Sequence, residues 1–188
     1  MGLGELLQNL KGAGDRKLCI LDLGPTSPAN IALITGMGAR VFNEDILRES
    51  QDPSYLVKQE DGSLQIDPAK FFADNLNYAA DQFDAILCWD VLDFLPESLV
   101  KPLVERLQVM LKLKGNLLAF FHTKDAGPDS LHSRHHIVPP DVLELEAVQG
   151  FRLQRIFNNR HIENLFSEFA SRKFFLGRDN IREVLMVR

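Results

Sequence analysis

The sequence predicts an α/β fold in which a doubly wound, mostly parallel sheet carries helices on both faces. Short apolar runs alternate with segments of helical periodicity along the chain, which is the order typical of α/β sheets. Residues 17–23 are almost entirely apolar, as strands buried on both faces are. Residues 17–43 read as a strand–helix–strand unit of about 28 residues, close to the size of a parallel crossover.

The first part of the chain gives the clearest elements. Residues 3–10 have the spacing of a short amphipathic helix. After the strand over 17–23, Ser27 and Pro28 predict the N-cap and first position of a helix that runs to about residue 35. Residues 39–43 predict the second strand.

Residues 47–77 are the hardest segment to assign. Asp52-Pro53 and Asp67-Pro68 each predict a cap followed by a first helical residue. A doubly wound sheet needs a third strand in this segment, but no run of residues marks it.

The second half continues the alternation. Residues 83–89 predict a buried strand, and apolar spacing after Pro96 predicts a helix that passes through Pro102 and ends at Gly115. The remaining predicted elements are a strand over 116–121, a helix over 140–149, a strand over 151–157, a helix over 162–169 and a strand over 181–188.

Composition indicates one globular domain. The chain has 188 residues, of which 45% are hydrophobic and 25% charged, and domains typically contain about 100–150 residues. No apolar run approaches the roughly 18 residues that a membrane span requires. Cys19 and Cys88 lie inside apolar runs, which indicates reduced core thiols and a cytoplasmic protein. We predict a single domain over 1–188, with an N-terminal helix region (1–16), a core (17–125) and a C-terminal part (126–188).

The charge of the chain is unevenly distributed. The net charge of −5 argues against nonspecific binding of nucleic acid or a membrane surface by the whole chain. Residues 151–188, however, contain eight Arg or Lys and four Asp or Glu, a net charge of +4. A solvated charged face is one interpretation. Contact with an anionic or acidic partner is the other.

Polar side chains follow the predicted strands where ligands bind in such sheets, at the carboxyl ends. Asp22 ends the first strand, Glu44 and Asp45 follow the second, and Trp89 and Asp90 follow the strand over 83–89. An acidic residue about 20 positions along, at the end of the second strand, suits a bidentate hydrogen bond to a ribose diol. A helix cap or solvated turn is the alternative role for Asp45.

The loop after the first strand discriminates between cofactors. A dinucleotide loop carries G-x-G-x-x-G, which lets the backbone approach a pyrophosphate. Here only Gly24 is present, with Thr26 in the place of the second glycine, and Pro28 removes a backbone donor at the helix start. The loop therefore disfavours binding of a pyrophosphate. A nucleoside without a phosphate needs fewer backbone donors at this site, so the loop is compatible with it.

Residues 21–24, residues 38–45 and residues 83–96 together resemble the class I S-adenosylmethionine-dependent methyltransferases. The resemblance covers roughly residues 17–125 by pattern, and the tail only by order of elements. It implies a Rossmann-like sheet of seven strands, the last inserted antiparallel beside the fifth, with S-adenosylmethionine as cofactor and the core over 17–125 binding it.

The resemblance also implies a set of cofactor-binding residues. The family's glycine loop holds the methionine part of the cofactor, its acidic residue after the second strand binds the ribose, and the residues after the fourth strand line the same site. These positions correspond here to Asp22, Gly24, Thr26, Ser27, Glu44, Asp45, Trp89 and Asp90. The loop is degenerate, because the later glycines of the family pattern are replaced.

Histidines supply the remaining candidates. His122 closes a strand on the candidate edge and is a weak candidate general base, because an imidazole titrates near neutrality; a histidine satisfied by the backbone is the alternative. His132, His135 and His136 cluster near Arg134, whose charge would repel a cation. We therefore expect no metal site there.

The leading hypothesis is a methyltransferase whose acceptor the sequence does not identify, since methyl transfer depends mainly on proximity and orientation. The alternative is a non-catalytic member of the fold, a pseudoenzyme that acts as a binding or assembly protein. The missing glycines weaken a third reading, an NAD-dependent oxidoreductase. A last apolar set indicates either core or the patch of a homo-oligomer, with an aromatic lid over a substrate as the alternative: Leu165, Phe166, Phe169, Phe174 and Phe175.

Overall fold

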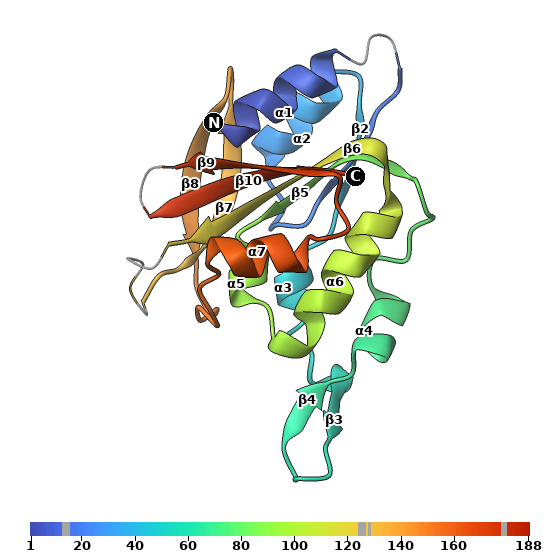
Figure 1. The fold of residues 1–188 in the computed structure, drawn as a ribbon, viewed down its shortest axis with the longest axis vertical. Helices are drawn as coiled ribbons and strands as arrows, with labels where there is room; N and C mark the ends of the chain where they lie inside the picture. The colour runs from blue at the N-terminus through green and yellow to red at the C-terminus, as the bar shows by residue number, and fades with distance from the viewer. Residues whose placement is uncertain (13–15, 124–126, 128, 178–179) are drawn as a thin grey trace.

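The computed structural model describes residues 1–12, 16–123, 127, 129–177 and 180–188. Its centre is a six-stranded sheet with strand order β2-β1-β5-β6-β10-β9 (Figure 1). These strands are β1 (Cys19–Asp22), β2 (Arg40–Asn43), β5 (Phe83–Trp89), β6 (Leu111–His122), β9 (Ser171–Leu176) and β10 (Ile181–Val187).

The sheet is mostly parallel. β1 pairs in parallel with β2 and β5, and β5 pairs in parallel with β6. Only β10 runs against its neighbours, antiparallel to both β6 and β9. The predicted fold class and the antiparallel final strand are therefore confirmed.

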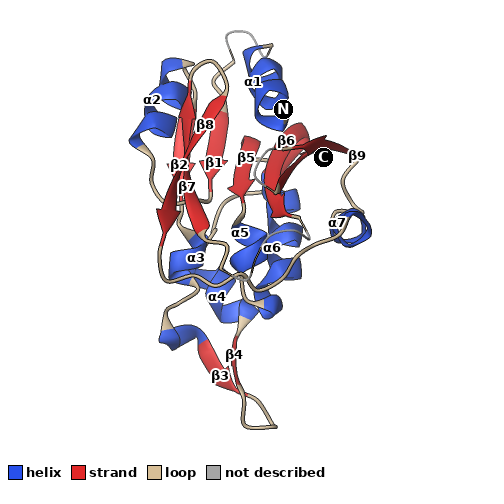
Figure 2. Cartoon of the chain, turned by 90° about the vertical axis from the view of Figure 1, so that its left-hand side faces the viewer, coloured by secondary structure: helices blue, strands red, loops and turns tan. Residues whose placement is uncertain are grey.

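Helices cover both faces (Figure 2). On one face, α1 (Gly2–Lys11) and α2 (Pro28–Gly36) pack through Leu6 and Ile34 in a cluster that includes Leu87 and Phe120 of the sheet. The other face is covered by α3 (Ile46–Glu49), α4 (Pro68–Asp74), α5 (Val91–Phe94), α6 (Glu97–Met110) and α7 (Asn159–Leu165). From Ala85 to Trp89, alternate residues of β5 enter the two clusters, as the two-residue period of a strand requires.

Local capping follows the sequence closely. Ser27 is the N-cap of α2 and accepts a hydrogen bond from the Asn30 backbone, and Pro28 is the first helical residue. Asp67 caps α4 in the same way, and Asp52 caps the 3₁₀ helix η1 (Pro53–Tyr55). These predicted element starts are confirmed, because each depends only on neighbouring residues.

The third strand of a doubly wound sheet is absent from the described residues. β3 (Leu56–Lys58) and β4 (Leu64–Ile66) pair with each other in a hairpin that protrudes at the lower end of Figure 1. The chain then enters α4 at the Asp67-Pro68 cap. The sheet therefore has six strands in place of the seven that the resemblance implies, and β2 forms its edge.

The C-terminal half departs most from the predictions. The predicted helix over 140–149 is strand β8 (Val142–Val148), which pairs with β7 (His132–Val138). Its apolar and acidic residues alternate from Leu143 to Glu146, and this two-residue period outweighs the helix signal of Pro140. The predicted strand over 151–157 has no regular structure, and β9 lies at the sheet edge instead.

Gly115 lies inside β6 and does not end a helix, because α6 already ends at Met110. A Cβ on Gly115 would lie 2.8 Å from the Lys112 carbonyl oxygen. The glycine therefore allows the irregular start of β6 to pass close to its own backbone.

No helix in the described ranges is long and apolar enough to cross a membrane.

Candidate functional site

The carboxyl ends of β1, β2 and β5 meet at one edge of the sheet. The strand register places Asp22 beside Asn43 of β2 and beside Leu87 of β5, two residues before Trp89. The structure thus brings Asp22, the loop that begins at Gly24, and Trp89 together, as the sequence predicts for a ligand-binding edge.

Each oxygen of the Asp22 carboxylate accepts a hydrogen bond from a donor of the protein itself. Asp22 is 2% exposed. Its Oδ1 accepts hydrogen bonds from the Trp89 indole Nε1 at 2.6 Å and the Gly24 backbone nitrogen at 3.1 Å, and its Oδ2 accepts from the Asn30 Nδ2 at 3.1 Å. Burial raises the pKa of Asp22, and these three hydrogen bonds oppose the rise.

The Trp89 indole lies against the glycine loop. A Cβ on Gly24 would be 2.9 Å from the indole Cδ1, so glycine is needed at this position. Trp89 has a left-handed backbone with φ of 49°, which is uncommon for a residue with a large side chain. On its other side the indole stacks on the His135 ring, with centroids 4.8 Å apart and planes 3° from parallel.

Thr26 and Ser27 differ in position. Thr26 is exposed, and its hydroxyl donates to the Asn43 Oδ1 at 2.5 Å. Ser27 is buried, and its Oγ shares a 2.9 Å hydrogen bond with the His136 Nδ1. The Asn43 amide also donates to the carbonyl oxygens of Asp22 and Gly24, so the loop is held by β2.

Glu44 and Asp45, the predicted ribose ligands, both hold neighbouring segments. Glu44 accepts a 3.0 Å hydrogen bond from the Leu76 backbone nitrogen. It also bonds the Tyr78 hydroxyl, whose pKa is raised by burial and then by this carboxylate. Asp45 is the N-cap of α3 and accepts from the Arg48 nitrogen at 3.2 Å. Their binding of a ribose stays a prediction.

The hairpin formed by β7 and β8 is fixed to this edge at several points. Its His132 Nδ1 lies 2.8 Å from Asp90 Oδ1, and its Ser133 nitrogen donates to Asp90 Oδ2 at 3.3 Å. Asn30 of α2 donates to the His135 carbonyl at 2.9 Å and accepts from the Ile137 nitrogen at 2.8 Å. The sequence predictions missed this hairpin, although the alternation in β8 was a usable signal.

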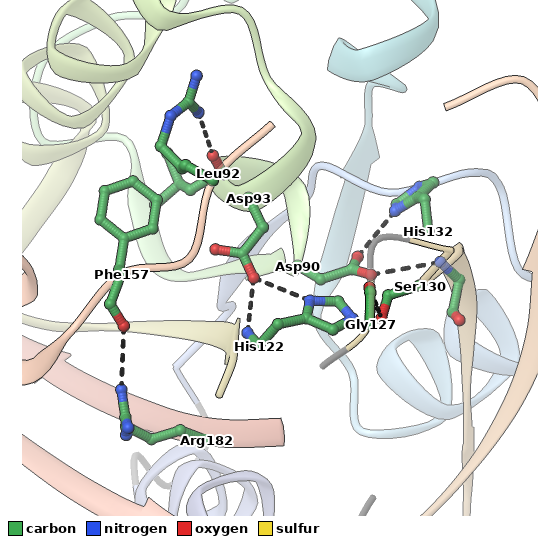
Figure 3. Close-up of polar contacts among 11 residues, drawn as sticks. Asp90, Leu92, Asp93, His122, Gly127, Ser130, His132, Phe157 and Arg182 are labelled. Atoms are coloured by element: carbon green, nitrogen blue, oxygen red, sulfur yellow. Dashed lines mark hydrogen bonds and ion pairs between the residues drawn. The ribbon is translucent and has the colours of Figure 1, made fainter. Parts of the chain in front are cut away.

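Asp90 and Asp93 each pair with a buried histidine, as Figure 3 shows. Asp93 Oδ2 accepts from the His122 backbone nitrogen at 2.6 Å and lies 2.9 Å from His122 Nδ1. Burial raises the pKa of Asp93 to about 6, against the effect of these bonds. Burial also opposes ionisation of Asp90, but the His132 hydrogen bond and nearby histidine charges keep its pKa below the usual value.

His122 is held in place chiefly by Asp93 and is almost fully buried. Its role as a general base stays a prediction. His135 is also buried, and burial lowers its pKa to about 4. Within the described ranges, no group of three or more His, Cys, Asp or Glu side chains could hold a metal ion. His136 and Arg134 instead contact Glu146 of the same hairpin.

No protein-family model and no curated protein matches this sequence. Solved structures do. An S-adenosylmethionine-dependent methyltransferase from Methanosarcina mazei has a TM-score of 0.55 at 14% identity, over 96% of this chain and 96% of that one. A methyltransferase of the same cofactor dependence from Archaeoglobus fulgidus has a TM-score of 0.55 at 8% identity, over 98% and 92%.

A third neighbour was solved with ligands bound. This is the 1,6-didemethyltoxoflavin-N1-methyltransferase of Burkholderia thailandensis, which contains S-adenosylhomocysteine, with a TM-score of 0.51 at 14% identity over 98% of this chain and 76% of that one. The chain therefore has the fold of the class I S-adenosylmethionine-dependent methyltransferases, and the resemblance seen in the sequence is confirmed.

The closed edge does not fit an adenosyl cofactor in this arrangement. The resemblance assigns the methionine part of the cofactor to the loop of Gly24. The Trp89 indole already packs against this loop, since a Cβ on Gly24 would lie 2.9 Å from its Cδ1. Both oxygens of Asp22 and both oxygens of Asp90 are bound to groups of the protein. A cofactor at these residues requires the β7–β8 hairpin and Trp89 to move first.

Proposed function

We propose that this chain is a non-catalytic protein of the methyltransferase fold that acts by binding. One observation carries the proposal: the β7–β8 hairpin and Trp89 occupy the edge of the sheet that the fold uses for its cofactor. The hairpin contributes His135, which stacks on Trp89, and His132, which bonds Asp90. Most of these side chains are buried and hydrogen-bonded to one another, so at this edge they pack as part of the protein interior and do not face solvent.

Energetics support a closed edge. Opening would break the His132–Asp90 hydrogen bond, a charged one worth about 1.5–3 kcal/mol. It would also break the Trp89–His135 stack, worth about 0.5–1.5 kcal/mol, and two Asn30 hydrogen bonds of roughly 1 kcal/mol each. These contributions sum to at least about 4 kcal/mol. An opening cost of that size lowers the apparent affinity of any ligand of the open state by roughly a thousandfold.

The second candidate function is an S-adenosylmethionine-dependent methyltransferase that opens its hairpin. It is favoured by the fold likeness. It is also favoured by Asp22 and Gly24, which the resemblance in the sequence assigns to the cofactor loop. In that case, Asp22 would bind the cofactor after Trp89 leaves it, and His122 would face the acceptor.

Calorimetric titration with S-adenosylhomocysteine separates the two functions. We expect no binding by the natural protein. A hairpin variant, His132→Ala with His135→Ala, removes the Asp90 bond and the stack on Trp89, and His161→Ala is the control because His161 is exposed and remote from this edge. Binding by the natural protein at micromolar ligand would overturn the proposal. Binding by the hairpin variant alone would show a closed site that retains its ligand contacts.

A further inference from the structure

A second concave site lies apart from the closed edge. It is a cavity of about 900 Å³ between the end of β6, the segment before α7, and Gly177 and Asn180 beside the ends of β9 and β10. Small-molecule sites usually have volumes of about 300–1,000 Å³. Neither of the proposed functions uses this cavity.

Polar residues that line the cavity include Arg182, Asn158 and Thr123. Arg182 is the only charged residue among the described residues that line the cavity. One of its guanidinium nitrogens donates to the Phe157 carbonyl at 3.3 Å, as Figure 3 shows, and no carboxylate of the described ranges lies within ion-pair distance of it. The Thr123 hydroxyl oxygen is buried without a hydrogen-bond partner in the described ranges.

Its apolar wall is unusually exposed. Leu176 is 90% exposed, the largest exposed fraction among the large hydrophobic residues described, and Ile156 is 37% exposed. Both side chains line the cavity, on opposite segments of the chain. An apolar group between them would remove this surface from water, which is favourable in proportion to the area covered.

The contacts of the other basic residues single out Arg182 in the positive C-terminal segment. Arg155 pairs with Glu97, Lys173 with Glu5, and Arg188 with Asp81. Arg172 donates to two carbonyl oxygens at the end of α7. Three basic residues of this segment therefore pair with carboxylates, whereas Arg182 has no carboxylate partner in the described ranges and lines the cavity.

We propose that this cavity binds a small amphipathic anion, with a carboxylate or phosphate head at Arg182 and an apolar chain along Ile156 and Leu176. The guanidinium supplies donors that match either head group. Asn158 and Thr123 add neutral polar groups to the lining of the same cavity. The ligand class extends the proposed function, because it names what a non-catalytic chain would bind.

Calorimetry tests the proposal with decanoate and decyl phosphate, each below its micelle-forming concentration, and with decanol below its solubility limit. We expect one or both anions to bind, and decanol to bind at least tenfold more weakly. Comparing decanoate with decyl phosphate identifies the head group. Binding of decanol as tight as that of the anions would overturn the role of Arg182, and binding of none of the three would overturn the site.

Variants locate the binding. Arg182→Gln should weaken anion binding at least tenfold, and Leu176→Ser should weaken it severalfold. Arg152→Gln is the matched control, because Arg152 is an exposed arginine of the same segment that does not line the cavity. Equal losses in Arg152→Gln and Arg182→Gln would mean nonspecific charge attraction and would overturn the proposal. A negative result for anion binding would not change the result of the S-adenosylhomocysteine titration, so each proposal can be overturned independently of the other.

Discussion

The hydrogen bond between the Trp89 indole and the Asp22 carboxylate closes the predicted cofactor edge, and a double-mutant cycle measures it. Both groups are buried, and the two atoms are 2.6 Å apart. Trp89→Phe removes the donor but keeps an aromatic ring to stack on His135. Asp22→Ala removes the acceptor. A hydrogen bond to a charged group contributes about 1.5–3 kcal/mol.

We expect a coupling energy of about 1.5–3 kcal/mol between the two substitutions, since each single variant already loses the shared bond. Trp89→Phe alone should lower the free energy of unfolding by at least that amount, because truncating a buried indole also leaves a cavity. The assay is urea unfolding followed by far-UV circular dichroism, since Trp89 is the only tryptophan and its fluorescence is lost in the variant.

Phe120→Leu provides the control cycle with Asp22→Ala. Phe120 packs edge-on against Trp89 with ring centroids 5.5 Å apart, but it has no hydrogen bond to Asp22. The coupling energy between Phe120→Leu and Asp22→Ala should stay within about 0.5 kcal/mol, because the two side chains share no hydrogen bond. A Trp89–Asp22 coupling no larger than the control would refute the closed arrangement of this edge.

Four further predictions concern single residues of the same region. His135 has a pKa of about 4 in the folded protein, against an ordinary value of 6.5, so acidification favours the unfolded state. His135→Phe should therefore reduce the loss of unfolding free energy between about pH 7 and about pH 5 by about 2 kcal/mol. Urea titrations at both pH values measure this difference. Asp93 acts in the opposite direction because its pKa is raised, so Asp93→Asn should increase the acid sensitivity measured in the same titrations. Gly24→Ala places a Cβ 2.9 Å from the Trp89 ring and should cost about 1–3 kcal/mol in thermal unfolding; an unchanged melting temperature would contradict the contact. Asp45→Ala removes the N-cap of α3 and should lower the free energy of unfolding by about 1 kcal/mol. A decrease of less than a few tenths of a kcal/mol would argue against the cap.

The sequence by itself determined the elements whose signals are local and strong. The apolar run of β5 is predicted with its observed bounds, because a strand buried on both faces needs apolar residues throughout. Ser27 and Pro28 start α2 as predicted, since a cap is formed by residues within one turn. The order of these elements also places Asp22 and Trp89 at one edge, since carboxyl ends of parallel strands meet there.

Only the tertiary structure decided whether that edge is open. The contacts that close it join residues far apart in the chain, such as Trp89 with His135 and Asp90 with His132. Each residue taken alone is equally consistent with a ligand site, because a carboxylate or an indole binds a cofactor and a protein group by the same hydrogen bonds. The β7–β8 hairpin occupies this edge because its histidines complete the buried hydrogen bonds of Asp90 and Ser27, a pairing that no local pattern encodes.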